Sequence, residues 1–579
     1  MDEQTETGLA RIKSYLYDNF WLGLILLAGF SVRFYGIYFD YPFGVTSIWE
    51  ETPSMMHLIN MIEARTIFTG TYAYGLLLPL LYVPGFVLRV IYLAVVHGLY
   101  DVVALKKFLI LNGMGHIYIV GRWYGVAFGT ASIYLVYKIA WLIFKNKTSA
   151  YYAALVHSFS LIPVFLFHWG KLHGPMIFFL LLSFYAALIF DQKKNNKHLY
   201  LSSLAAALAF TLHYTGIVSV IFPLYAWYIN KSQVGFKKFF QAALVFIVST
   251  VFLYSANLTG VTKYVKGVYE SYYSKTGLAG VYQVSLIERL TFVFRDTFRV
   301  EPIFFILFFL TLVLGIRRVR DEREEKFLLV GVLFSFFLLV TVIVGPHMTR
   351  WLVAFIVLIT LYAAGKFPAY LKKKNISATL RLLILTVLLI PNIVFAVKWD
   401  SLLGANTNSE AISWLKDNLK NDEIVYSFDN FIDPPLTFDA VIWNLENNQR
   451  TDSKKANFIR DNAGDFKNIS GINMIYDYDH KRFKDLAGPK TRFALFYFWQ
   501  SGDDQNYRYD IMTRKDTLKT IGEVKNYHGL ELVKKFYPSE DQGLIEKGID
   551  DYMNNPLDWR DFWRLDKSGP FIEIYEIKD

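Results

Sequence analysis

Residues 174–197 read GPMIFFLLLSFYAALIFDQKKNNK, and this stretch contains the pattern that decides the fold. An almost purely apolar run is followed at once by Lys193, Lys194 and Lys197. A run of about 20 apolar residues is long enough to cross a bilayer as a helix. Lysines directly after such a run are typical of the cytoplasmic end of a membrane helix. The stretch therefore predicts a membrane-spanning helix with a defined orientation.

The same pattern recurs along most of the chain, which predicts an α-helical polytopic membrane protein. Apolar segments of about 15–25 residues are long enough to span or nearly span a bilayer. They occupy residues 20–38, 118–144, 150–167, 174–190, 199–213, 215–229, 239–257, 301–316, 327–345, 350–366 and 380–398.

One further stretch, residues 76–97, is ambiguous, because it contains Pro79, Pro84 and Arg89 and suits either a span or a helix at the interface. The positive-inside rule decides between the two. If this stretch does not cross, all the basic clusters fall on the cytoplasmic side, and about eleven spans result. These clusters are Arg11/Lys13, Lys145/Lys147, Lys193/Lys194/Lys197, Lys231/Lys237/Lys238, Arg317/Arg318/Arg320 and Lys372/Lys373/Lys374.

Composition agrees with this class. Of the 579 residues, 54% are hydrophobic and 18% are aromatic, which is more than a soluble chain usually carries. The net charge of +10 resides mainly in the short clusters between apolar runs, so it does not indicate a nucleic-acid partner. The chain has no cysteine, which excludes a disulfide, a thiolate metal site and a cysteine nucleophile.

The eleven-span arrangement predicts two domains. Residues 1–399 form the transmembrane domain, whose first outer loop, 39–117, contains helices lying along the membrane. Residues 400–579 read as a small soluble α/β domain on the extracytoplasmic face. In it, 408–419 is amphipathic, and strand-like segments occupy 423–428, 492–499 and 571–577. We expect the protein to reside in the cell membrane with this C-terminal domain outside.

Glu50 and Glu51 lie just beyond the first span and are candidates for catalysis. A carboxylate at the membrane surface is suited to remove a proton from an incoming hydroxyl, and a neighbouring like charge raises its pKa toward the working range. The alternative is structural: two acids and Pro53 in the first turn of the next helix. The sequence leaves both interpretations open.

Several basic side chains are predicted at the same outer face, either between spans or near their ends. Ionisable residues near apolar spans are costly and tend to be functional, and together these would suit a lipid-linked phosphate or diphosphate. A single one of them is equally typical of an interfacial anchor. A metal site built from His168 and His173 does not match a known ligand spacing, so no metal ligand is assigned. The candidate phosphate-binding residues are Arg122, Lys171, His173, His213 and Arg350.

These motifs resemble the GT-C glycosyltransferases, and most closely glycosyltransferase family 39, the branch of protein O-mannosyltransferases and aminoarabinose transferases. Members place an Asp-Glu pair in the first outer loop, where this chain has Glu50-Glu51. The other matching stretches are Ser31-Val32-Arg33-Phe34-Tyr35-Gly36, Gly121-Arg122-Trp123, Lys171-Leu172-His173, His213-Tyr214-Thr215-Gly216, Thr349-Arg350-Trp351, Ala411-Ile412-Ser413-Trp414-Leu415 and Gly569-Pro570-Phe571-Ile572-Glu573-Ile574-Tyr575. The chain departs from the family pattern where Glu50 replaces Asp, His173 an acid and His213 a lysine.

The resemblance implies a GT-C-like fold and transfer of a sugar from a polyprenyl-phosphate donor to an acceptor hydroxyl on a protein, lipid or glycan. Glu50 or Glu51 would take the acceptor proton, and a single carboxylate base implies inversion at the anomeric carbon. The basic residues would stabilise the departing phosphate. The sequence leaves the cofactor open, including a divalent cation. Alternatives are a transporter or lipid flippase, and a non-catalytic membrane anchor that binds glycan.

Overall fold

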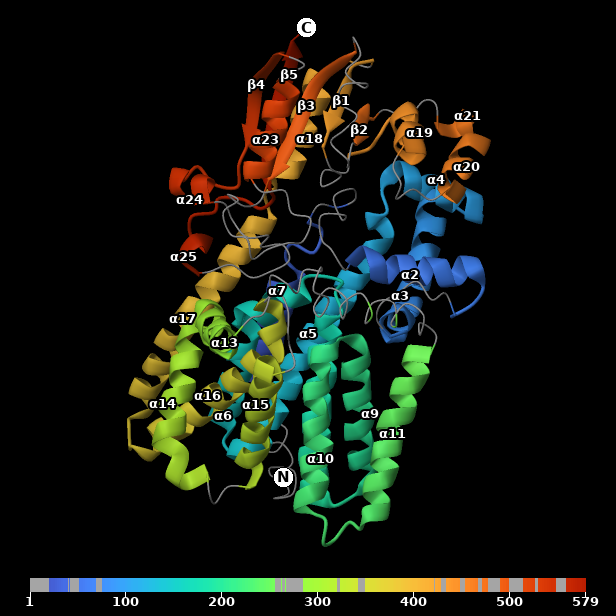
Figure 1. Ribbon diagram of the computed structural model, residues 1–579. Coiled ribbons are helices and arrows are strands. Elements are labelled where there is room, and N and C mark those ends of the chain that lie inside the picture. The colour runs from blue at the N-terminus through green and yellow to red at the C-terminus, as the bar shows by residue number, and fades with distance from the viewer. Residues whose placement is uncertain are drawn as a thin grey trace, which may run out of the picture. The chain divides into compact units, whose positions relative to one another are not determined.

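The structure is a computed structural model of the chain (Figure 1). It describes residues 20–39, 41, 51–68, 75–255, 262, 266, 285–319, 323–341, 349–420, 422–428, 434–447, 453–466, 471–476, 490–498, 514–525, 529–547 and 559–578.

The chain divides into two compact units. The first unit comprises residues 1–37, 53–83 and 120–397, and the second comprises 38–52, 84–119 and 398–579. The helices of the first loop therefore divide between the units, and α3 (Leu77–His97) contributes to both.

The first unit is helical in its described residues, and Figure 1 shows most of its helices side by side in a bundle. Its apolar runs form helices because a backbone in lipid must satisfy its own hydrogen bonds. The elements are a helix over Phe20–Phe34, then α2 (Glu51–Ala64), α5 (Gly115–Phe144), α6 (Lys147–Phe159), α7 (Leu161–Phe167), α8 (His173–Lys193), α9 (Asn196–Leu212), the 3-10 helix η2 (Tyr214–Val220), α10 (Ile221–Ile229), α11 (Phe236–Ser255), α13 (Leu286–Val300), α14 (Pro302–Val319), α15 (Arg323–Thr341), the 3-10 helix η4 (Thr349–Leu352), α16 (Val353–Lys373) and α17 (Ala378–Leu403).

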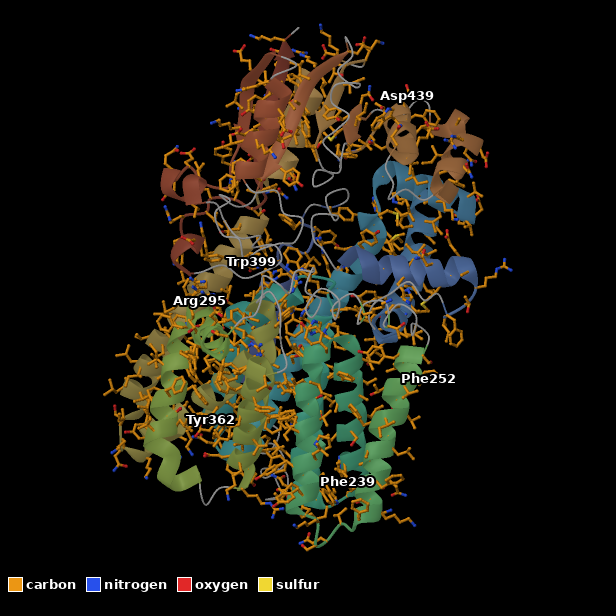
Figure 2. All side chains as sticks on the ribbon, in the orientation of Figure 1. Phe239, Phe252, Arg295, Tyr362, Trp399 and Asp439 are labelled. Carbon is orange, nitrogen blue, oxygen red and sulfur yellow. The ribbon has the colours of Figure 1, made fainter. Side chains whose placement is uncertain are left out.

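Side-chain burial in this unit matches a membrane protein. The centre of the bundle is packed with aromatic residues: the rings of Phe308 on α14 and Tyr362 on α16 lie 5.6 Å apart, and Figure 2 shows Tyr362 among these helices. The outer surface is apolar as well, since Phe252 on α11 is 60% exposed. Many of its apolar neighbours are also exposed, and a continuous apolar outer surface of this kind marks contact with another apolar phase.

Six described helices are long and apolar enough to cross a membrane, and a seventh is added if the bent pair α6 and α7 forms one span. The six are α3, α5, α8, α11, the segment Arg350–Lys373, and α17. Shorter apolar helices occupy Phe20–Phe34, Tyr214–Ile229 and Pro302–Val313. The prediction of a helical polytopic membrane protein is confirmed. The count of eleven stays a prediction, because α3 meets the same criterion as the helices expected to cross.

The C-terminal region of the second unit contains a mixed five-stranded sheet with the strand order β2-β1-β3-β5-β4. The strands are β1 (Ile424–Ser427), β2 (Met474–Tyr476), β3 (Thr491–Phe498), β4 (Gly529–Phe536) and β5 (Phe571–Lys578). β1 pairs in parallel with β2 and β3, whereas β5 pairs antiparallel with β3 and β4. A parallel pairing needs a crossover, and the connection from β1 to β2 contains α19 (Phe438–Asn447), α20 (Ser453–Asp461) and α21 (Ala463–Phe466). The other described helices of this region are α18 (Thr407–Asn418), α23 (Arg514–Lys525), α24 (Gln542–Lys547) and α25 (Trp559–Phe562).

Helices cover both faces of this sheet, because successive side chains of a strand point to opposite sides. Phe493 of β3 contacts Trp414 of α18, with 5.3 Å between the ring centroids. Phe496 of the same strand belongs to a buried cluster with Ile521 and Val524 of α23. The predicted strands at 423–428, 492–499 and 571–577 correspond to β1, β3 and β5, and the predicted helix at 408–419 corresponds to α18.

Two other helices of the second unit come from the first predicted outer loop. They are the C-terminal part of α3 and α4 (Val102–Asn112), whose first turn is capped by Asp101. Arg89 of α3 donates to the backbone oxygen of His116 at 2.8 Å and to the hydroxyl of Tyr41 at 3.1 Å. Most of the described part of the loop is therefore helical, and its position along the membrane surface stays a prediction.

Candidate functional site: a buried cationic cluster

The two predicted catalytic acids are at the edge of what the structure describes. Glu50 lies outside the described residues, and Glu51 is the first residue of α2, with no description of its side chain. Pro53 is in the first turn of the same helix, as the structural alternative requires. The assignment of either glutamate as a base stays a prediction.

Arg122 is buried on α5 and is fixed by the surrounding backbone and aromatic rings. Its Nη1 donates to the carbonyl oxygen of Ile37 at 2.7 Å. The central carbon of its guanidinium lies 5.3 Å from the ring centroid of Trp169, a cation–π geometry. These contacts place the charge of Arg122 against the turn that carries Lys171.

Two glycines make this approach possible. A Cβ built on Gly170 would lie 3.0 Å from the Cα of Gly121, so neither position has room for a side chain without movement. The hydroxyl of Tyr82 donates to the carbonyl oxygen of Gly170 at 2.8 Å and secures the same turn from α3. Backbone-to-backbone packing thus brings α5 and the turn between α7 and α8 together.

The turn between α7 and α8 contains Lys171, and His173 begins α8; both side chains are fully buried. His168, at the end of α7, has Nδ1 2.7 Å from the carbonyl oxygen of Val164 and Nε2 2.9 Å from that of Tyr35. Both ring nitrogens of His168 therefore face backbone carbonyl oxygens. The only role that the sequence suggested for His168 was that of a metal ligand.

His213 comes from the junction of α9 and η2, and its ring lies 4.4 Å from the ring of His173. Its Nδ1 is 2.7 Å from the hydroxyl of Thr215 and accepts from the Thr215 backbone N–H at 3.3 Å. His213 therefore caps η2 with one side of its ring while the ring packs against α8.

Arg350 lies in η4 and is 6% exposed. Its positive charge and that of Lys171 both act on the imidazole of His173. The ring of Trp351, the next residue, is 5.8 Å from that of Tyr214, which follows His213. Four helical elements therefore bring the predicted phosphate-binding residues together. We call Arg122, Lys171, His173, His213 and Arg350 the cationic cluster.

Arg33, which lies in one of the stretches that resemble the family, binds backbone carbonyls. Its guanidinium donates to the carbonyl oxygens of Gly29, His157 and Ser158, each at 2.9 Å. The central carbon of the guanidinium also lies 5.4 Å from the ring centroid of Phe167. Its contacts identify a structural role at the end of α6.

Within the part of the chain that the structure describes, no three His, Asp or Glu side chains are grouped so as to hold a metal ion. The carboxylates that a divalent cation prefers would come from Glu50 and Glu51, one outside the described residues and the other without a described side chain. The cofactor question therefore stays open.

Comparison with known proteins supports the resemblance. Residues 109–259, which include Arg122, Lys171, His173 and His213, match the family model for dolichyl-phosphate-mannose-protein mannosyltransferase. The match is confined to this segment, which is similar to that family. The predicted resemblance is confirmed there, in the segment that supplies four of the five residues of the cationic cluster. The comparison with curated protein sequences finds no match.

Solved structures of two other proteins are similar to the chain. The archaeal oligosaccharyltransferase AglB from Archaeoglobus fulgidus, in complex with an inhibitory peptide and a dolichol-phosphate, aligns with a TM-score of 0.47 at 10% identity, covering 97% of this chain and 89% of that one. ArnT from Cupriavidus metallidurans bound to undecaprenyl phosphate aligns with a TM-score of 0.47 at 10% identity, and the alignment covers 90% of this chain and 96% of ArnT. The apo structure of ArnT aligns with a TM-score of 0.44 at 12% identity, and the alignment covers 82% of this chain and 93% of ArnT.

Proposed function

We propose that the protein transfers a sugar from a polyprenyl-phosphate carrier to an acceptor hydroxyl at the extracytoplasmic face of the membrane. The observation that carries the proposal is the cationic cluster, four of whose five residues lie inside a segment that matches a mannosyltransferase family. The buried positive charges of Arg122, Lys171 and Arg350 attract a phosphate strongly, because the low dielectric of their surroundings screens the charges little. The acceptor class, whether protein, lipid or glycan, is left open.

The position of the cluster supports a donor held at the membrane surface. α8 has His173 at one end and Lys193 at the other, and its 21 residues correspond to about 30 Å of helix. This length matches the hydrocarbon core of a bilayer. With Lys193 in the cytoplasmic interface, His173 lies at the opposite interface, where a carrier's phosphate would be while its apolar chain stays in the lipid.

In the proposed reaction, Glu50 or Glu51 removes the proton from the acceptor hydroxyl as its oxygen attacks the anomeric carbon. The bond between that carbon and the phosphate oxygen breaks, and the carrier phosphate leaves with both bonding electrons. Lys171, Arg350 and the remaining members of the cationic cluster stabilise the charge on the leaving group. One displacement inverts the anomeric configuration.

The test uses purified protein in proteoliposomes with radiolabelled polyprenyl-phosphate sugars and candidate acceptors. Glu50→Gln and Glu51→Gln separate the two candidate bases, and we expect one of them to abolish transfer while donor binding persists. Lys171→Met should lower the transfer rate by about 10²–10³-fold, the usual effect of losing one group that stabilises developing charge. Lys197→Met, a matched change of an exposed lysine, should leave the rate unchanged.

Unchanged transfer in both glutamine variants would contradict the proposed base. Failure of the wild type to turn over any lipid-linked sugar would contradict the proposed function as a whole.

A further inference from the structure

A break divides the candidate span formed by α6 and α7. α6 ends at Phe159, α7 begins at Leu161, and the two axes differ by 56°. A break of this kind leaves carbonyl groups at the end of the first helix, and N–H groups at the start of the second, without partners in their own helix. In a membrane segment such groups need partners from elsewhere in the protein.

The carbonyl side of the break is bound by a cation. Arg33 donates to the carbonyl oxygens of His157 and Ser158, in the last turn of α6. This end of a helix carries the negative end of its dipole, so a guanidinium there is favourable.

The N–H side of the break is bound by an anion. Glu301 is 1% exposed, and its Oε1 accepts from the backbone N–H of Leu161 at 3.0 Å and from the hydroxyl of Ser160. Its Oε2 accepts from Nδ2 of Asn392 on α17 at 2.9 Å. The carboxylate thus connects the start of α7 to the residue that precedes α14 and to the middle of α17.

Ser160 and Leu161, which bind Glu301, begin the segment that continues through α7 to Lys171 of the cationic cluster. α7 is only seven residues long, about 10 Å, and Lys171 follows it by four residues. Arg33 also contacts Phe167 at the far end of α7. Fixing the start of such a short helix therefore fixes the direction in which the turn with Lys171 leaves it.

We propose that Glu301 is a positioning residue, which holds α7 at the break and thereby places Lys171 and His173 for an anionic lipid headgroup. Glu301 itself does not touch the headgroup. The identity of the ligand that Lys171 and His173 bind rests on the proposed function. The contact by which Glu301 fixes α7 does not depend on that function.

The test compares Glu301→Leu with Glu301→Gln in the full-length protein in detergent. Leucine has a similar size and accepts no hydrogen bond, whereas the glutamine oxygen can still accept from Ser160 and Leu161 while the Asn392 amide turns to meet its N–H. Glu325→Leu is the matched control, because Glu325 is a second buried glutamate, paired with Lys366 between α15 and α16.

Two readouts are measured: hydrogen–deuterium exchange over residues 160–173, and binding of undecaprenyl monophosphate by native mass spectrometry. In Glu301→Leu we expect exchange in 160–173 to rise and lipid binding to weaken by about tenfold or more, since buried donors lose their acceptor. Glu301→Gln should stay within about threefold of wild type in both readouts, because it keeps the acceptor. Glu325→Leu should raise exchange only in α15 and α16.

The proposal would be overturned if residues 160–173 of Glu301→Leu exchanged hydrogen at the wild-type rate. It would also be overturned if Glu325→Leu lost as much lipid binding as Glu301→Leu. Wild-type lipid binding despite faster exchange would overturn the link to the cationic cluster. If the wild type binds no polyprenyl phosphate while Glu301→Leu still loosens this segment, the proposed function fails and the hold on α7 stands. If Glu301→Leu does not fold, Ser160→Ala takes its place, with a smaller change in the same direction expected.

Discussion

At the scale of single residues, His213 has two roles, a helix cap and a ring contact, and two different substitutions can test them separately. Its Nδ1 caps η2 through Thr215, and its ring packs against His173. Asparagine is a good cap without an imidazole, so His213→Asn should keep the melting temperature and still lower sugar transfer. His213→Ala removes the cap as well and should cost about 0.5–2 kcal/mol of stability. Thermal unfolding together with initial transfer rates checks both. Equal melting temperatures for the two variants would show that the cap contributes nothing.

A second residue-scale prediction concerns acid stability in the second unit. The guanidinium of Arg564 donates to the Asp541 carboxylate and lowers the pKa of Asp541 from its ordinary value to about 2. An unfolded aspartate titrates near pH 3.9, so the stabilisation is present above that pH and is lost as the pH falls toward about 2. Asp541→Asn should flatten the fall in melting temperature between about pH 4 and pH 2.

Arg564→Gln should flatten the same curve, because it removes the partner that lowers the pKa of Asp541. The measurement is the melting temperature of the full chain at a series of pH values. A fall with pH as steep as that of the wild type in both variants would show that this pair does not contribute to acid sensitivity.

At the scale of elements, the close approach of α5 to the turn after α7 predicts a strong effect of one methyl group. Gly170→Ala would place a Cβ 3.0 Å from the Cα of Gly121, and relief requires the backbone to move. Overpacking of this kind typically costs about 1–3 kcal/mol. We expect a lower melting temperature and weaker binding of undecaprenyl monophosphate, since the turn carries Lys171.

Gly23→Ala is the matched control, because nothing lies within 4 Å of a Cβ built at Gly23 in the first helix. Its lipid binding should equal that of the wild type, and its melting temperature should be equal or slightly higher, because alanine favours a helix more than glycine does. If Gly170→Ala behaves like Gly23→Ala, the turn is free to move away from α5 without consequence.

The elements that the sequence predicts are those with a local signal. Apolar runs predicted the helices, because lipid leaves the backbone no other way to satisfy its hydrogen bonds. β2 was missed because it has only three residues, and β4, GLELVKKF, because most of it is exposed at the sheet edge. Glu301 was missed because its partners Leu161 and Asn392 lie 140 and 91 residues away. Only the folded chain shows that this acid lies at a helix break.

The cationic cluster was more accessible to prediction, for a reason of topology. Each member was placed at a turn or a span end on the same side of the membrane, and alternating spans must return to that side. Two arginines near span ends make different tertiary contacts. Arg33 binds carbonyls at the end of α6, whereas Arg122, the one predicted to bind phosphate, contacts the turn beside Lys171.

At the scale of the whole molecule, the open question is whether α3 crosses the membrane, because that decides the side on which every later segment lies. Without a crossing, Lys237 is cytoplasmic and Asp417 is outside. The chain has no cysteine, so Lys237→Cys and Asp417→Cys each introduce a single thiol, and both positions are exposed. In intact cells, a membrane-impermeant maleimide should label Asp417→Cys alone, and Lys237→Cys should react only after permeabilisation.

The reverse pattern would show that α3 crosses, and it would move the cationic cluster and the C-terminal sheet to the cytoplasmic side together. The donor would then have to present its sugar on the cytoplasmic leaflet, and the six basic clusters would contradict the positive-inside rule at five positions. Because one labelling result fixes the side of both units, it tests the proposed extracytoplasmic transfer without any knowledge of the sugar or the acceptor.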